Sequence, residues 1–176
     1  AYEVDRTPGA NPIRQPLDNL NEAGSLYGAI IYQKAPIVMR HLEALLGADS
    51  FRDGVREYLN AHKFGNATWN DLIEVLDRRT PTDLRAWSKV WVEQPGRPTV
   101  TTKLEVADGK ITRLAFEQSD PMKRGLIWPQ QLRVTVGCGV QWRRIVTELV
   151  GREVDLMPSL DGCVPEYVLA GGEGWG

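Results

Sequence analysis

The sequence predicts an α+β fold in which an N-terminal α-helical segment is followed by an antiparallel β-sandwich. Up to Pro95-Gly96 the apolar residues recur at the spacing of amphipathic helices. From Arg97 onward they alternate with polar residues, which is the pattern of half-buried strands. The balance of acidic and basic residues does not change at this point. The switch of period therefore predicts two domains, 1–96 and 97–176.

Length and composition exclude several classes of protein. The chain has 176 residues, of which 42% are apolar and 25% charged, the ordinary balance of a globular protein. No apolar run approaches the ~18 residues that a membrane-spanning helix needs. A net charge of −2 gives no reason to expect nucleic acid or an anionic membrane as partner. Arg143 and Arg144 directly follow Trp142, but alternation places the two arginines on opposite faces of one predicted strand.

The first helical region is interrupted by a proline. Residues 1–22 contain three prolines and are expected to form a loop or arm. An apolar stripe follows from Leu26 to Leu46, but Pro36 cannot lie in the middle of a straight helix because it has no N–H and clashes with the preceding turn. The pattern predicts a short helix that ends near Ile31 and a second that begins around Gln33 and stops at Gly47.

Three more helices are expected before the switch of period. One begins at Asp49 or Ser50 and carries one apolar face, formed by Phe51, Val55, Tyr58 and Leu59. The next is opened by Thr68-Trp69-Asn70-Asp71, which has the spacing of a capping box. Thr80-Pro81-Thr82-Asp83 predicts the same device for the last helix, with proline at its first position. That helix is expected to bury Leu84, Trp87, Val90 and Trp91.

The second half of the chain predicts short antiparallel strands. Asp108-Gly109 separates two alternating runs, 100–106 and 111–117, and is a strong signal for a hairpin. Further strands are expected at 127–137, 140–149 and 152–156, with a last strand near Tyr167. Short strands joined by glycine- and proline-containing turns favour a β-sandwich.

No complete catalytic motif is present in the sequence. His41 and His62 lie on different predicted helices and outside any zinc-binding pattern, so we interpret both as structural or surface residues. Cys138 and Cys163 lack the close spacing of a metal or redox motif, and packed free thiols are the simpler interpretation. Composition alone would make Tyr32 an aromatic residue of the core or of a helix start.

Several segments nevertheless occur in a familiar order. They are Ile31-Tyr32-Gln33-Lys34-Ala35 with the helix after it, Leu46-Gly47 with Phe51, Gly54 and Tyr58, Gly65-Asn66-Ala67-Thr68 with Asp71-Leu72, Trp91–Pro98, Trp128-Pro129 and the final turn 172–176. In this order they resemble the aminopeptidase N-type zinc metallopeptidases, the gluzincin aminopeptidases. The chain departs from that pattern at Ala35, where the family usually has glycine, and at the following Pro36.

The resemblance implies a role for one residue. In these enzymes zinc and a glutamate activate a water that attacks the N-terminal peptide carbonyl, and a tyrosine hydroxyl donates to the resulting oxyanion. The matching position is Tyr32. The resemblance also implies that 1–96 is the C-terminal helical part of a thermolysin-like catalytic domain and that 97–176 is the β-sandwich after it. The family's His-Glu-x-x-His motif, its third zinc ligand and its Gly-x-Met-Glu-Asn loop precede the tyrosine and are not found in this sequence.

Two hypotheses follow. The first is a fragment of a zinc-dependent aminopeptidase that acts on peptides, with no metal ligand or cofactor site of its own and no activity in isolation. The two ends of the chain, which are not those of a typical domain, agree with a fragment, and a helical face left uncovered could make it associate with itself. The alternative is a non-catalytic, peptidase-like interaction module. The sequence upstream of Ala1 would separate the two, since intact zinc ligands favour the enzyme.

Overall fold

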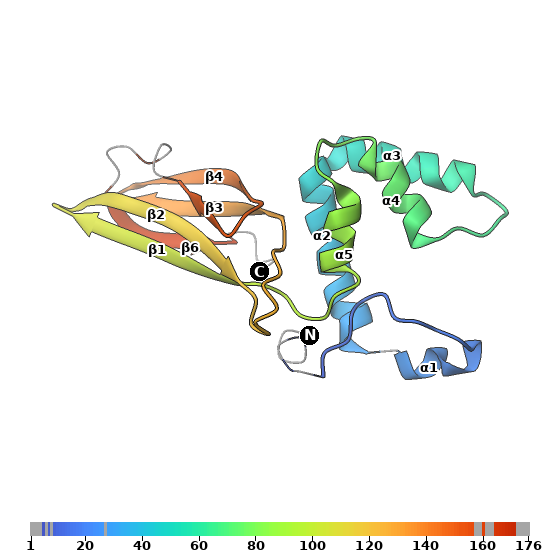
Figure 1. Ribbon diagram of the computed structural model, residues 1–176. Helices are drawn as coiled ribbons and strands as arrows, with labels where there is room; N and C mark the ends of the chain where they lie inside the picture. The colour runs from blue at the N-terminus through green and yellow to red at the C-terminus, as the bar shows by residue number, and fades with distance from the viewer. Residues whose placement is uncertain are drawn as a thin grey trace. The chain divides into compact units, whose positions relative to one another are not determined.

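The computed structural model describes residues 5, 7, 9–26, 28–156, 160 and 164–171. The chain forms two compact units, Ala1–Arg97 and Pro98–Gly176. Helices make up the first unit and antiparallel strands in two sheets make up the second (Figure 1). The predicted α+β fold class, with helices followed by antiparallel strands, is confirmed.

The helical unit is a series of short helices joined by tight turns. In order they are the 3₁₀ turn Leu20–Glu22, α1 (Ala23–Leu26), the π-helical turn Ile30–Lys34, α2 (Ala35–Leu46), α3 (Ala48–Ala61), α4 (Trp69–Asp77) and α5 (Leu84–Trp91). Helix α2 carries Pro36 in its first turn and ends at Gly47, as predicted. Within the part of the chain that is described, no helix has the length and apolar character needed to cross a membrane.

The capping box predicted for α4 is confirmed, whereas the one predicted for α5 is wrong. The Thr68 hydroxyl accepts from the Asp71 amide, and the Asp71 carboxylate accepts from the Thr68 amide at 2.8 Å. Helix α5 begins at Leu84 and not within 80–83, because two carboxylates supply acceptors there. Asp83 accepts from the Ala86 amide at 2.9 Å and Asp77 accepts from the Leu84 amide at 2.8 Å. The carboxylates therefore set the helix start after the proline turn.

The core of the helical unit is built from α2, α4 and α5. Its fully buried side chains are Leu42, Leu76, Leu84 and Trp87. Helix α3 contributes less than its pattern predicts: Leu59 is 60% exposed, and the residue of α3 that is buried is Gly54. Val90 is only half-buried, in contrast to the prediction for α5.

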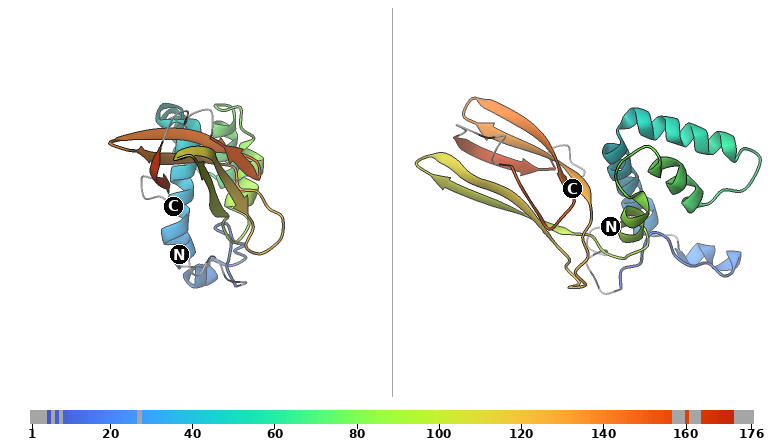
Figure 2. Two further views of the ribbon diagram at one scale, coloured as in Figure 1. Left: turned by 90° about the vertical axis from the view of Figure 1, so that its left-hand side faces the viewer. Right: turned by 45° about the horizontal axis from the view of Figure 1, so that its top comes forward.

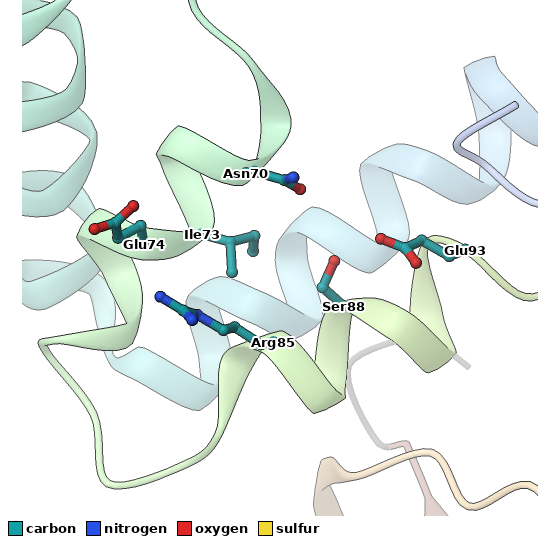
Figure 3. Close-up of a pocket in the computed structure, with 6 residues that line it drawn as sticks. All are labelled: Asn70, Ile73, Glu74, Arg85, Ser88 and Glu93. Carbon is teal, nitrogen blue, oxygen red and sulfur yellow. The ribbon is translucent and has the colours of Figure 1, made fainter. Parts of the chain in front are cut away.

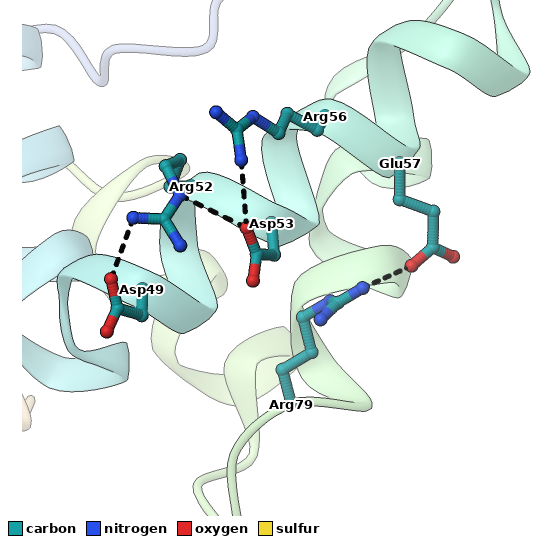
Figure 4. Close-up of polar contacts among 6 residues, drawn as sticks. All are labelled: Asp49, Arg52, Asp53, Arg56, Glu57 and Arg79. Carbon is teal, nitrogen blue, oxygen red and sulfur yellow. Dashed lines mark hydrogen bonds and ion pairs between the residues drawn. The ribbon is translucent and has the colours of Figure 1, made fainter.

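The solvent side of α3 is covered by ion pairs. Arg52 binds Asp49 at 2.8 Å and Asp53 at 3.1 Å along the helix (Figure 4). Glu57 reaches across to Arg78 and Arg79, which follow the end of α4. Hydrogen bonds from the two arginines lower the pKa of Glu57, and the bond from Arg79 has the larger effect. Most of the surface of α3 is therefore charged, in agreement with its small buried face.

The second unit contains two three-stranded antiparallel sheets. One has the order β1-β2-β5 and the other β4-β3-β6 (Figures 1 and 2). The strands are β1 (Thr99–Ala107), β2 (Lys110–Ser119), β3 (Gln130–Cys138), β4 (Gln141–Leu149), β5 (Glu153–Asp155) and β6 (Pro165–Ala170). The Asp108-Gly109 hairpin is confirmed, with φ of 50° and 72° at its two residues. Positive φ at both positions is the geometry of a type I′ turn, whose twist matches that of the strands.

The two sheets share one hydrophobic core. It contains Ile111, Leu114, Phe116, Leu132, Val134, Val136, Leu149, Leu156 and Leu160. A buried Gln118 joins this core to the loop segments around it. Its side chain accepts from the Trp128 amide at 2.9 Å and donates to the Gly151 carbonyl at 2.6 Å. The Trp128 amide and the Gly151 carbonyl therefore each have a hydrogen-bond partner within the protein.

The interpretation of Cys138 as a free thiol is wrong, because this residue is disulfide-bonded. The other cysteine of the sequence, Cys163, lies outside the described residues, as does the turn 172–176 that contributes to the family resemblance. Two cysteines 25 positions apart carry no spacing signal that separates a free thiol from a disulfide.

Candidate functional site

Tyr32 lies at the centre of the π-helical turn Ile30–Lys34. The Ala35 amide donates to the Ile30 carbonyl, five residues back, and this bond defines the turn. Ile30 and Lys34 are buried, whereas Tyr32 is 62% exposed. Its ring is therefore not part of the core of the helical unit, and its side chain is accessible from solvent.

Pro36 gives a local reason for the π turn. In a regular α-helix its nitrogen would face the carbonyl of Tyr32, to which it cannot donate, and its ring would clash with that carbonyl. Widening the preceding turn by one residue relieves this clash. Upstream, the Tyr32 amide donates to the Gly28 carbonyl at 3.1 Å. The sequence predicted a helix break here, and the structure replaces that break with a continuous but wider turn.

A buried ion pair lies two residues from Tyr32. The Lys34 ammonium donates to the Asp5 carboxylate at 2.9 Å and to the Gly96 carbonyl at 2.7 Å. The Gly96 amide donates to the same Asp5 oxygen at 3.0 Å. The Lys34 and Asp5 side chains are only 6% and 2% exposed. Three segments of the helical unit, around residues 5, 34 and 96, are thus joined at one point.

The N-terminal arm is also attached to the end of α5. The Arg14 amide donates to the Val92 carbonyl at 2.9 Å, and its guanidinium pairs with Glu93 at 3.2 Å. The same guanidinium donates to the Asn70 side chain at 3.1 Å. The predicted loop or arm, residues 1–22, is therefore attached to the rest of the helical unit at Asp5 and at Arg14.

The two histidines lie apart. His41 of α2 stacks on Trp91 of α5 with ring centroids 5.1 Å apart, and burial lowers its pKa. His62 follows α3 and lies against Tyr58. Among the described residues, no group of three or more His, Cys, Asp or Glu side chains could hold a metal ion. The donor set of these residues therefore does not fit a zinc site.

A polar cleft lies between α4 and α5. It is lined by Asn70, Ile73, Glu74, Arg85, Ser88 and Glu93 (Figure 3). The Ser88 hydroxyl accepts from the indole of Trp69 at 2.7 Å. No histidine lines the cleft to act as a base toward Ser88, and Tyr32 is not among its lining residues. The cleft does not form a catalytic arrangement with the predicted site residue.

Comparison with known proteins defines the class of this chain. A model of the peptidase family M1 domain matches residues 1–91. Aminopeptidase N of Streptomyces lividans is 34% identical over 69% of this chain and 14% of that protein. Aminopeptidase 2, mitochondrial, of Saccharomyces cerevisiae is 32% identical over 84% of this chain and 16% of that protein. These matches place the chain among the peptidases. It belongs to peptidase family M1.

A solved structure shares the fold. Aminopeptidase A of Legionella pneumophila, crystallised in complex with aspartic acid, superposes with a TM-score of 0.65 at 18% identity and covers 82% of this chain. The chain spans 17% of that protein and about a sixth of the relatives named above.

The buried Asp5–Lys34 pair is the part of the site region that sequence reasoning missed. Asp5 and Lys34 are 29 positions apart, and Asp5 and Gly96 are 91 apart. The one local signal is that Lys34 follows Ile30 by four residues, a spacing that places both on one face of a helix.

Proposed function

We propose that this chain is part of a zinc-dependent aminopeptidase that removes N-terminal residues from peptides, with Tyr32 as the donor to the transition-state oxyanion. Membership of peptidase family M1 supports the class of enzyme, and the relatives named above are aminopeptidases. The observation that carries the role of Tyr32 is its outward-facing phenol, 62% exposed on a π-helical turn. Such turns are frequent at functional sites.

A phenol suits this role on chemical grounds. It is neutral at ordinary pH and donates a single hydrogen bond, so it can stabilise an oxygen whose negative charge grows in the transition state. The donor must sit on a rigid element, because its benefit depends on its position when the charge forms. Tyr32 meets this condition, since buried residues flank it on both sides within the same turn.

We propose that the zinc ligands of the full-length protein lie outside this chain. When bound, zinc would polarise the peptide carbonyl and supply an activated water. The described residues do not offer a ligand set for it. We therefore propose that the isolated chain hydrolyses no aminoacyl-anilide. One equivalent of tightly bound zinc, together with activity that a chelator removes, would contradict this.

The role of Tyr32 is tested by Tyr32→Phe in the full-length protein that carries this chain. The variant keeps the ring and removes the donor, so kcat on an aminoacyl-anilide should fall by about 10²–10³ with little change in KM. Tyr58→Phe is the matched control, because its hydroxyl donates a long hydrogen bond to the Thr68 carbonyl, at 3.5 Å, and is assigned no role in the reaction. Unchanged turnover in Tyr32→Phe would remove Tyr32 from the mechanism.

A further inference from the structure

The Asp5–Lys34 pair is difficult to explain by stability alone. Both side chains are almost fully buried, and removing two charges from water costs about as much as their attraction returns. Apolar residues of similar volume often stabilise such a position equally well. A buried ion pair does fix geometry, because its groups have few other ways to be satisfied. The question is which part of the helical unit it holds in place.

The pair fixes the end of the turn that carries Tyr32. Lys34 is the last residue of the π turn, and its ammonium is held at 2.9 Å from Asp5 and 2.7 Å from the Gly96 carbonyl. Asp5 in turn accepts from the Gly96 amide at 3.0 Å, which closes a ring of three hydrogen bonds. Gly96 has φ of 88°, a left-handed conformation that leaves both of its peptide groups available to this ring.

The π turn needs such an anchor more than a regular helix does. Pro36 cannot donate to the backbone of the turn, so the usual hydrogen-bond ladder is incomplete just after Tyr32. The wider turn therefore depends on side-chain contacts to keep one conformation. Ile30 at its start is anchored by burial, and Lys34 at its end by the ion pair.

We propose that Lys34 and Asp5 are positioning residues, which hold the π turn so that the Tyr32 hydroxyl is fixed where the oxyanion forms. This inference rests on the proposed role of Tyr32. Displacing a catalytic group by ~1 Å can cost up to ~10²-fold in rate. Loss of the Asp5–Lys34 pair should therefore lower turnover by displacing the Tyr32 hydroxyl. Neither Lys34 nor Asp5 is proposed to contact the substrate.

The test is a double-mutant cycle in the full-length protein. Lys34→Met, which removes the charge and keeps an unbranched side chain one atom shorter, should lower kcat by about 10-fold with KM nearly unchanged. In a Tyr32→Phe background the same change should lower kcat by less than about 2-fold, because the hydroxyl that Lys34 positions is already absent. Lys63→Met, at an exposed lysine, is the matched control and should leave kcat unchanged in both backgrounds.

A purely structural role would give a different pattern. An equal loss of kcat in both backgrounds would overturn the proposal while leaving the role of Tyr32 intact. Wild-type turnover in Tyr32→Phe would refute the role of Tyr32 and the positioning role with it. If Lys34→Met does not fold, the neutral pair Asp5→Asn with Lys34→Met removes the uncompensated buried carboxylate and is read by the same criteria.

Discussion

The contact between α3 and α4 at Gly54 allows a stability prediction whose sign is set by the structure. A Cβ at this position would lie 2.4 Å from Leu76 Cδ2 and 3.1 Å from the Arg79 side chain. Leu76 is fully buried and cannot move aside into solvent. Replacing glycine by alanine would favour the helix by about 1 kcal/mol. Overpacking a core contact costs about 1–3 kcal/mol. Gly54→Ala should therefore destabilise the helical unit by about 1 kcal/mol.

The expected result is a lower Tm for the helical unit, by about 4–8 °C for each kcal/mol in a domain of this size. Thermal unfolding followed by far-ultraviolet circular dichroism measures it. Gly24→Ala in α1 is the matched control, since no atom lies within 4 Å of a Cβ added there, and this change should not lower Tm.

A second variant, Leu76→Ala, tests whether the effect of Gly54→Ala comes from steric overlap with the Leu76 side chain. Leu76→Ala alone should cost about 2–5 kcal/mol through the cavity it leaves. Adding Gly54→Ala in that background should be neutral or stabilising, because the new methyl group then meets only the Arg79 side chain among these two neighbours, at 3.1 Å, where a small shift suffices. If Gly54→Ala in the wild-type background raises Tm, helix propensity outweighs the contact and the inferred approach of the two helices is wrong.

Three further predictions concern stability. Burial lowers the pKa of His41 from its ordinary 6.5. Between the lowered pKa and 6.5 the unfolded chain binds more protons than the folded chain. The free energy of unfolding should therefore be unaffected by His41 above pH 6.5 and fall as the solution is acidified below it. His41→Phe keeps a ring against Trp91 and should weaken this acid dependence in denaturation curves; an unchanged dependence would assign it to other groups. Thr68→Ala removes the cap of α4 and should cost about 1 kcal/mol in the same assay, whereas no change would mean that the cap is not formed in solution. Cys138 should resist alkylation until a reductant is added, and reduction should destabilise the strand unit by about 2–4 kcal/mol, as mass spectrometry and denaturation would show. Alkylation without reductant would contradict the disulfide.

Local signals account for the parts of the fold that could be predicted. The Asp108-Gly109 hairpin and the Thr68–Asp71 cap each depend on residues within a few positions of one another, and both are confirmed. The prediction misplaced the start of α5 because it treated 80–83 as a capping box, whereas Asp83 accepts from the Ala86 amide and Asp77, seven residues before Leu84, accepts from the Leu84 amide. Periodicity placed Leu59 on the inner face of α3, although this residue is 60% exposed and the buried residue of that helix is Gly54.

The region around Tyr32 likewise has features that the sequence predicted and features that it did not. Tyr32 was identified by resemblance to a family and not by its physical setting, since composition alone would have assigned it to the core or to a helix start. The structure places it exposed on a π-helical turn, a geometry that periodicity did not predict. The Asp5–Lys34 pair joins residues far apart in the sequence, and the spacing of Lys34 from Ile30 does not identify Asp5 as its partner. Contacts of this kind are set by tertiary packing, which periodicity cannot reveal.

The π turn also changes how residues on either side of it can be compared. An α-helix rotates by about 100° per residue, so one extra residue in a turn shifts every later side chain by that angle relative to the earlier ones. Ile30 and Lys34 of the turn and Val38, Leu42 and Leu46 of α2 are all buried and recur every four positions, so the buried face continues through the wider turn. Removing one residue from the turn would rotate Ile30 by about 100° relative to the buried face of α2 and would turn the phenol of Tyr32 to another side of the helix. The chain length between Ile30 and Pro36, as much as the identity of any residue, determines where that hydroxyl points.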